Sequence, residues 1–267
     1  MKKYLINVNN EIVGLRIDLI IPQKIDGVTR SFLKNNILNL TVNDKKEKIS
    51  YKCKTGDKIY FELKDVVEND ILPEDIPLDI KYEDENYIVV NKKQGMVVHP
   101  AKGNYSGTLV NALMGLKKKL SDNGDLTRLG IVHRLDKDTS GLIIIAKNNQ
   151  SHNYLQKLFA ERKIIKRYRA IVRGFFPQGR VDIENLIGRN PNNRKKMAVV
   201  TSKGKVAVTQ VVVKRRVANY SYLNINLKTG RTHQIRVHLS HLGFPILGDV
   251  LYSRKDAKYK DIPLCLV

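Results

Sequence analysis

The sequence contains no tryptophan and only two cysteines among its 267 residues. Cys53 and Cys265 stand far apart, so we expect two reduced thiols rather than a disulfide or a metal site. No apolar run approaches the ~18 residues of a transmembrane helix. The N-terminus starts basic but soon turns polar, without the apolar segment of a secretory signal. These absences favour a cytoplasmic protein that does not insert in a membrane.

Acidic residues are also scarce, since 26 aspartates and glutamates stand against 48 lysines and arginines, a net charge of +22. A field of this sign attracts polyanions, and nucleic acid is the partner that it favours. The excess is uneven, because residues 65–85 alone carry nine acidic side chains and one basic one. A Lys-rich composition without a partner stays open. So does an anionic membrane surface, although no basic amphipathic helix stands out.

The acidic stretch divides the chain in two. It contains prolines and few aromatic residues, which predicts a linker over residues 65–78. An N-terminal domain would then occupy residues 1–64 and a larger domain residues 79–267. A chain of this length is long enough for one or two domains with real cores.

In the N-terminal part, apolar spacing predicts a helix over residues 14–23 and a second helix over residues 28–40. A strand and turn at 40–44 follow, and a turn at Gly56–Asp57 precedes an alternating strand. The expected inward positions of the two helices are Leu15, Leu19, Ile20, Phe32, Leu33, Ile37 and Leu40.

The larger part mixes strands with irregularly spaced helices. Strands are predicted at 87–93, 141–147, 166–174, 205–216 and 220–228, and helices from about Thr108, over 149–163 and over 232–243. The inward helix positions are Tyr154, Leu155, Leu158, Phe159, Ile235, Leu239 and Leu242. No internal repeat is visible. The order of elements predicts an α+β fold rather than a βαβ repeat.

The segment HRLDKDTSGL, residues 133–142, is the first candidate for chemistry. Its D-x-D-x-S-G pattern copies half of a calcium loop, but the twelfth position, which needs a bidentate glutamate, is Lys147. A turn capped by aspartate and serine is a second interpretation. A third makes Asp136 a nucleophile or base, because a nearby arginine keeps a carboxylate ionised and aims it.

Three further stretches accompany this segment in order along the chain: VVNKKQGMVVHPAKGNYSGTLVNAL before it, then KRYRAIVRG and LKTGRTHQIRVHL after it. Together with GIVHRLDKDTSGLIIIAKN they resemble the four motifs of the Rlu-type (RluA/RluD) RNA pseudouridine synthases over about residues 87–252. One departure is Lys93-Gln94, where the family usually has a proline and a small residue. The resemblance implies an α+β catalytic domain with a mixed, mainly antiparallel sheet and flanking helices.

Residues 14–64 resemble the S-four RNA-binding module, a small α/β domain that commonly precedes such a catalytic domain. Its RNA-binding side chains would be Arg30, Lys34 and Lys45. Thr29 stands where a serine before Arg30 is usual, and no glycine precedes the following strand. A generic small α/β domain therefore stays open.

The family resemblance implies that uridine in RNA is isomerised to pseudouridine, without a metal, nucleotide or organic cofactor. Asp136 would be the essential carboxylate, whether it attacks the sugar or the base or abstracts a sugar proton. Tyr168 would stack on the uracil and act in late proton removal, and Arg236 would pair with Asp136. Arg134, supported by His133, would fill the space left by the flipped-out uridine. Each of the three also has a plainer interpretation: Tyr168 as a strand aromatic, Arg236 as a solvated helix charge and Arg134 as a phosphate contact.

The last predicted helix opens near Arg231, where backbone N–H groups can bind a phosphate. We count His233 and Ile235 with the substrate-binding residues. His238 and His241 share a helix face and, with His233, suggest zinc. The glutamate of an HExxH motif is missing, which favours phosphate or packing contacts.

The loop GRNPNNRKKM is basic and is expected to clamp an RNA backbone, with a solvated charge run as the alternative. Its basic members are Arg189, Arg194, Lys195 and Lys196.

Within the family, the motifs most resemble enzymes that modify large-subunit ribosomal RNA, especially its intersubunit stem-loop. We expect a monomer that acts on ribosomal RNA or on the assembling large subunit. Another ribosomal site, tRNA, a non-catalytic RNA-binding or assembly factor and, remotely, a metal-dependent nuclease stay open. The chain stops at DIPLCLV, where relatives begin a strand and about one further hairpin, so we also expect an exposed sheet edge.

Overall fold

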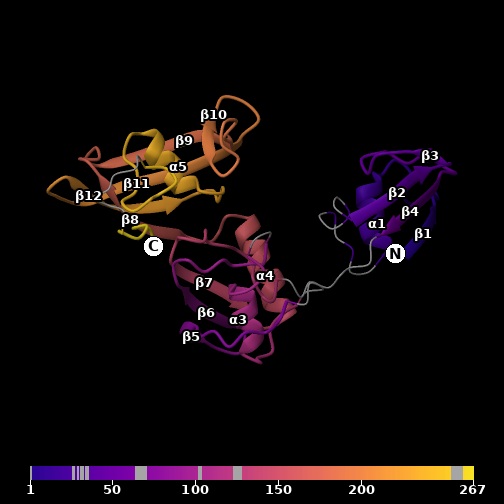
Figure 1. Cartoon of the computed structure of the whole chain (residues 1–267), viewed down its shortest axis with the longest axis horizontal. Coiled ribbons are helices and arrows are strands. Elements are labelled where there is room, and N and C mark those ends of the chain that lie inside the picture. The colour runs from indigo at the N-terminus through magenta and orange to yellow at the C-terminus, as the bar shows by residue number, and fades with distance from the viewer. Residues whose placement is uncertain are drawn as a thin grey trace. The chain divides into compact units, whose positions relative to one another are not determined.

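The residues that the structure describes form three antiparallel sheets (Figure 1). The computed structural model describes residues 2–25, 28, 30, 33, 36–63, 71–101, 104–122, 128–253 and 261–267. Two units, Met1–Ile71 and Leu72–Val267, make up the chain. None of the helices in the described ranges is long and apolar enough to cross a membrane.

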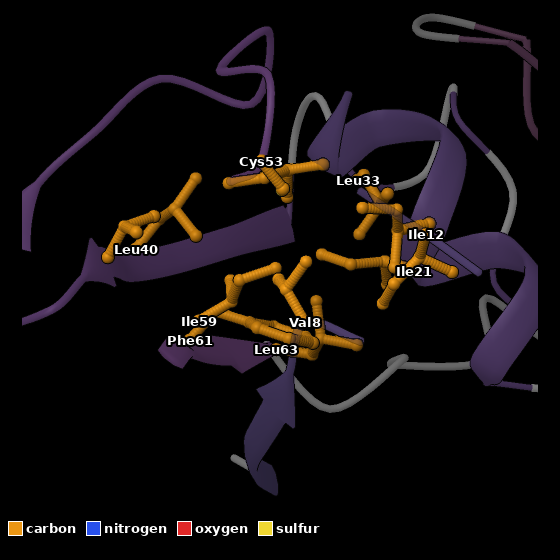
Figure 2. Packing of buried hydrophobic residues seen from close by; sticks show 12 residues of the cluster. Val8, Ile12, Ile21, Leu33, Leu40, Cys53, Ile59, Phe61 and Leu63 are labelled. Atoms are coloured by element: carbon orange, nitrogen blue, oxygen red, sulfur yellow. The ribbon is translucent and has the colours of Figure 1, made fainter. Parts of the chain in front are cut away.

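The N-terminal unit contains one sheet with the strand order β1–β4–β2–β3. Its elements are β1 (Lys2–Asn7), α1 (Ile17–Lys24), β2 (Ile37–Val42), β3 (Lys45–Lys46) and β4 (Lys58–Leu63). Helix α1 buries Ile17, Ile20 and Ile21 against side chains of the sheet, including Ile59 and Phe61 of β4. Figure 2 shows apolar side chains of this cluster, among them Ile21, Ile59 and Phe61, directed toward one another from helix and strands. Each contributes about 1.5–3 kcal/mol by leaving water.

The second predicted helix is wrong at its C-terminal end, because Ile37 and Leu40 lie on β2, which pairs with β4. The three-residue spacing of Ile37 and Leu40 also fits a helix face, but backbone pairing with β4 makes this segment a strand. Leu33 is buried in the same core. Phe32 and Lys34 lie outside the described residues.

Both cysteines are free, as predicted. Cys53 is part of the N-terminal core, and burial raises the pKa of its thiol to about 11.

The predicted acidic linker extends too far toward the C-terminus. Its residues 65–70 lie outside the described ranges, but Leu72 and Glu74 belong to the second unit. The carbonyl of Leu72 accepts a hydrogen bond from Asn111 Nδ2 at 2.9 Å, and the Glu74 carboxylate accepts the Gly107 N–H at 3.0 and 3.1 Å. Gly107 immediately precedes the N-cap of a helix, where a negative charge is favourable. This electrostatic attraction favours the position of Glu74 beside the start of that helix.

The second unit contains a three-stranded sheet, β5–β6–β7, and a five-stranded sheet, β10–β9–β11–β12–β8. The strands are β5 (Asp79–Glu83), β6 (Tyr87–Lys92), β7 (Gly141–Ala146), β8 (Lys166–Arg173), β9 (Arg180–Arg189), β10 (Met197–Val200), β11 (Lys205–Val217) and β12 (Tyr220–Leu227). The helices are α3 (Leu109–Gly115), α4 (Asn149–Ala160) and α5 (Gln234–His241). The predicted α+β class with mainly antiparallel sheets is confirmed.

The helices pack on the sheets through narrower faces than the spacing suggested. Leu155 of α4 and Leu239 of α5 are buried, but Tyr154 and Leu242 are 56% and 40% exposed. Tyr154 lies one position off the buried stripe of α4, and Leu242 follows the last turn of α5, so neither side chain points inward. The face of α5 packs with β8 and β12 residues such as Val172 and Leu223 in the core of the larger sheet.

The last residues of the chain lie along the free edge of β8. Arg169 N donates to Val267 O at 2.6 Å, and Val267 N donates to Arg169 O at 3.0 Å. A further bridge joins Ala170 and Leu266. This part of the sheet edge is therefore paired rather than exposed.

Candidate active site

Asp136 lies in a small pocket of about 130 Å³ in the second unit. Four segments form it: the turn before β7, Tyr168 on β8, the residues that lead from β12 into α5, and Leu266 near the end of the chain. The structure thus brings together most of the predicted site. The predicted residues that line the pocket are Arg134, Asp136, Tyr168, Arg231, His233, Ile235 and Arg236.

The turn that carries Asp136 is held from both sides. Thr139 N donates to the Asp136 carbonyl at 3.2 Å, and Gly95 N donates to the Lys137 carbonyl at 2.9 Å. Gly141, which begins β7, has a φ of 126°, a value that side chains disfavour. The predicted turn interpretation therefore accounts for the backbone of this segment and leaves the Asp136 carboxylate directed at the pocket.

Lys92 is a functional candidate that the sequence analysis missed. Its side chain is fully buried at the end of β6, and Nζ donates to the carbonyls of Lys93, Met96 and Lys137 at 2.9, 2.9 and 3.1 Å. Burial lowers the pKa of Lys92 to about 8, against the attraction of Asp138 and Asp136. All three donors of the ammonium group are satisfied, as a buried charge requires. Lys92 lies two residues after Val90 and four after Ile88, both buried, so the alternation of β6 could have predicted that its side chain is buried as well.

Tyr168 reaches the pocket because alternation along β8 places it on the same face as buried Ala170 and Val172. Burial, and then the charge of Asp136, raise the pKa of Tyr168 to about 12. Its phenol group is consequently protonated at neutral pH.

Arg236 lines the pocket, but its partner differs from the predicted one. Its Nε and Nη2 donate to the two carboxylate oxygens of Asp249, both at 2.8 Å, rather than to Asp136. The guanidinium also lies over the Tyr252 ring at 5.1 Å. Asp249 pairs with Arg236 in place of Asp136 because its two carboxylate oxygens accept both N–H groups on one edge of the planar guanidinium inside the protein. The attraction of Asp136 still contributes to the raised pKa of Arg236.

His233 lies closest to Asp136 among the cations and histidines of the pocket. Its Nε2 is 4.0 Å from Asp136 Oδ2, and its Nδ1 is 2.7 Å from the hydroxyl of Tyr252. Tyr252 and Asp249 were both missed, because the segment LGDVLY carries no periodic signal that links it to the site.

His133 does not line this pocket. Its Nε2 accepts the N–H of Ile144 on β7 at 3.1 Å, and its ring stacks on Phe159 of α4 at 4.9 Å. Burial, and then the charge of Lys166, lower the pKa of His133 to about 4. The imidazole is therefore neutral and ties the segment before Arg134 to β7. Arg134 itself is exposed at the pocket.

The predicted phosphate cradle at Arg231 is not formed as expected, because α5 begins three residues later. The N–H of Arg231 donates to Gln234 Oε1 at 2.9 Å, and its Nε donates to the Val206 carbonyl at 2.9 Å. Ile235 is buried and contributes the apolar wall of the pocket.

The zinc alternative receives no support. His238 is fully buried, with Nδ1 at 2.9 Å from Thr209 Oγ1, and His241 is exposed. Across the described ranges, no three histidine, cysteine or acidic side chains are grouped closely enough to hold a metal ion.

A larger groove of about 1210 Å³ adjoins the pocket, and Tyr168 and Leu135 line both. It lies between residues of the two sheets, and none of its lining residues is acidic. Its lining cations are Lys81, Lys166, Arg167 and Arg169. Burial and the nearby charges of Arg162 and Arg231 lower the pKa of Lys166. This excess of positive charge suits an anionic ligand.

The predicted basic loop connects β9 and β10. Arg194 and Lys195 are exposed, while Arg189 donates to the Arg194 carbonyl at 2.9 Å and shapes the loop. Lys196 lies 5.9 Å from the centre of the Tyr252 ring, which places this end of the loop beside the site.

In the N-terminal unit, Lys45 and Arg30 are exposed. Arg30 also donates to the buried carboxylate of Asp18 at 2.7 Å, so it serves the fold as well as the surface.

Comparison with known proteins gives a consistent result. Residues 86–241 match a family model described as RNA pseudouridylate synthase. A ribosomal large subunit pseudouridine synthase D from Neisseria meningitidis serogroup B is 43% identical over 247 residues, which are 91% of this chain and 65% of the relative. The chain therefore spans just under two thirds of that protein. The synthase D of Zymomonas mobilis is 43% identical over 93% of this chain and 80% of the relative.

Among solved structures, human RNA pseudouridylate synthase domain containing 1 resembles this fold with a TM-score of 0.59 at 29% identity. The match covers 71% of this chain and 76% of the human one. With the family model, the relatives and the fold in agreement, the chain belongs to the RNA pseudouridylate synthase family.

Proposed function

We propose that this chain isomerises uridine to pseudouridine in RNA, with Asp136 as the essential carboxylate. The observation that carries the proposal is the meeting of Asp136, Tyr168 and Arg236 at one small pocket beside a cationic groove. The reaction needs no redox partner, since the bond between the ribose and the ring nitrogen is exchanged for one to ring carbon 5. Carbon 5 loses its hydrogen as a proton and the ring nitrogen released from the ribose takes up a proton, so substrate and product are isomers.

The three side chains take separate roles. Asp136 is 20% exposed in its side chain and can reach the nucleotide directly. Arg236 is fixed by Asp249 and supplies a positive charge that does not move during the reaction. Tyr168 stacks on the uracil and donates a hydrogen bond to it, because a phenol with a pKa of about 12 keeps its proton at neutral pH.

Access to a base in folded RNA requires that the nucleotide be extruded. We assign Arg134, exposed at the pocket, to the space that the flipped uridine leaves. The groove cations and the exposed Arg194 and Lys195 contact the phosphate backbone. The N-terminal unit adds an S-four-like RNA-binding surface that includes Arg30 and Lys45.

The substrate that we propose is large-subunit ribosomal RNA, at the intersubunit stem-loop, either free or in the assembling subunit. The names of the Neisseria and Zymomonas relatives and the resemblance of the motifs support this choice. We propose that the enzyme works as a monomer in the cytoplasm.

Release of tritium from ribosomal RNA labelled at carbon 5 of uridine tests the activity. The wild-type protein should release tritium without added metal. Asp136→Asn should abolish release while RNA binding persists, and Asp182→Asn, an exposed aspartate on β9, should release normally. No release by folded wild-type protein, or undiminished release by Asp136→Asn, would overturn the proposal.

A pseudouridine map of ribosomal RNA from cells lacking the protein tests the target. We expect pseudouridine to be lost from the intersubunit stem-loop of the large-subunit RNA. Loss confined to tRNA or to another ribosomal site would contradict the choice of substrate but not the activity.

A further inference from the structure

The hydroxyl group of Tyr252 lies between two nitrogen atoms. It accepts the backbone N–H of Met197 at 2.8 Å, and it is 2.7 Å from Nδ1 of His233. A backbone N–H can only donate, so it occupies a lone pair of the phenol oxygen. The hydroxyl group still has one hydrogen to donate. Within the described residues, the acceptor at hydrogen-bond distance from it is His233 Nδ1.

This arrangement decides which ring nitrogen of His233 carries hydrogen. If Nδ1 accepts from Tyr252, a neutral imidazole must have its hydrogen on Nε2. The opposite assignment would give the phenol oxygen two donors and leave its own hydrogen unbound in a half-buried place, which is costly. Nε2 is the nitrogen that lies 4.0 Å from Asp136 Oδ2.

We propose that Tyr252 fixes His233 as the Nε2–H tautomer, so that His233 is a neutral hydrogen-bond donor to Asp136 and cannot act as a base toward it. Tyr252 is then a positioning residue. The distance of 4.0 Å is too long for a hydrogen bond, and it shortens when RNA fills the pocket. The kinetic consequence rests on the proposed function, whereas the tautomer does not.

Both rings are held in place by other contacts. His233 has a φ of 56°, a left-handed conformation that histidine adopts more readily than most residues. The Tyr252 ring and the imidazole meet edge to face, with their ring centres 5.5 Å apart. The guanidinium of Arg236 lies over the face of the Tyr252 ring. The Tyr252 N–H donates to Asp249 at 3.0 Å. Asp249 therefore orients Arg236 and Tyr252 together.

Burial favours the neutral form of the imidazole over the imidazolium. Burial is the largest influence and lowers the pKa of His233. The charges that face it come from several segments and oppose one another. They are Asp136 and Asp249, which favour the imidazolium, and Arg236 and Arg134, which disfavour it.

A neutral donor suits the proposed chemistry of Asp136. An imidazolium would form an ion pair with the carboxylate and reduce its nucleophilicity. A neutral Nε2–H instead orients one oxygen and leaves the other for the nucleotide. The same hydrogen prevents Nε2 from taking a proton from the substrate.

Nuclear magnetic resonance of the full-length, ¹⁵N-labelled protein without RNA tests the tautomer directly. Long-range ¹H–¹⁵N correlations of the His233 ring, assigned from their absence in His233→Gln, should show a protonated Nε2 and a bare Nδ1 at neutral pH. Tyr252→Phe should shift the Nδ1 signal and populate the Nδ1–H form. Hydrogen on Nδ1, or on both nitrogens, in the wild-type protein would overturn the proposal.

Kinetics test the positioning role. Tyr252→Phe should lower kcat by at least about tenfold with little change in KM, since a wrong tautomer leaves RNA contacts intact. The matched control is Tyr154→Phe, an exposed tyrosine on α4, which should keep wild-type kcat. His233→Gln, whose amide can donate from about the place of Nε2, should be more active than His233→Leu. Equal activity of these two variants would refute a donor role.

A double variant separates the tautomer from a merely structural role. In the His233→Gln background there is no tautomer to fix, so adding Tyr252→Phe should cause little further loss of kcat. Full additivity of the two losses would contradict the proposal. Thermal unfolding of each variant shows whether it is folded. If the wild-type protein has no synthase activity, the resonance experiment still decides the tautomer.

Discussion

Asp249 holds the guanidinium of Arg236 through two hydrogen bonds of 2.8 Å, and both side chains are almost completely buried. The same carboxylate accepts the backbone N–H groups of Leu251 and Tyr252 at 3.0 Å. A single acidic side chain thus joins α5 to the segment that follows it and keeps an arginine beside Asp136. Its loss would leave a positive charge in the interior without a partner.

We predict that Asp249→Ala lowers the free energy of unfolding by about 3–5 kcal/mol, because breaking a buried ion pair strands the other charge. Urea unfolding measures the change. The matched control is Asp182→Ala, whose ion pair with Arg180 lies in solvent, and it should change stability little. A loss for Asp249→Ala no larger than that of the control would show that Arg236 finds another partner.

The stability of the protein should depend on His133 below neutral pH. Burial lowers the pKa of His133 in the folded protein to about 4 from its ordinary value of 6.5. The unfolded chain therefore binds more protons between these values, and stability falls as pH drops from about 6.5 toward 4.

His133→Gln keeps an acceptor for the Ile144 N–H but removes the titrating group. Its unfolding free energy should fall less steeply with decreasing pH, by up to about 1.4 kcal/mol per pH unit for one proton. Urea unfolding between pH 8 and pH 4.5 measures both slopes. Gln150→Ala, an exposed and non-titrating change on α4, should keep the wild-type slope. Identical slopes for His133→Gln and wild type would argue against a neutral, buried His133.

Two variants of Tyr168 should separate the stacking of its ring from the hydrogen bond of its hydroxyl group. Tyr168→Phe keeps the ring and removes only the hydrogen bond to the uracil, so RNA affinity should be preserved while single-turnover tritium release slows by about two- to tenfold. Tyr168→Leu should weaken binding as well, because the stacking surface is lost. Filter binding measures the affinity. Normal release by Tyr168→Phe would show that the ring alone matters.

The basic loop should contribute to affinity through phosphates. Lys195→Gln should weaken RNA binding at low salt and reduce the slope of log affinity against log salt by about one. Lys163→Gln, an exposed lysine after α4 that pairs with Glu161, is the control and should keep the wild-type slope. If both variants keep that slope, the loop is a solvated charge run.

The motif residues were recognised through their resemblance to a known family, and local rules predicted the secondary structure on which they lie. Alternation placed Tyr168 on a half-buried strand face, and the D-T-S-G run predicted the turn after Asp136. Thr108 was correctly placed at the start of a helix, where it accepts the Asn111 N–H in a capping box. Strands β1, β3, β5, β9 and β10 were not predicted. Charged and polar residues interrupt the apolar alternation of β1, β5 and β9, whereas β3 and β10 are very short, and pairing with neighbouring strands stabilises all five.

The partners of the site residues were decided only by the tertiary structure. The family resemblance identified Asp136 and Arg236 as site residues and implied that they pair directly. The fold instead gives Arg236 to Asp249 and brings His233 near Asp136, with Tyr252 behind it. Residue type and period determine which side chains face a site. The partner of a buried charge depends on which group from another segment satisfies it best after packing, and that is not encoded in local spacing.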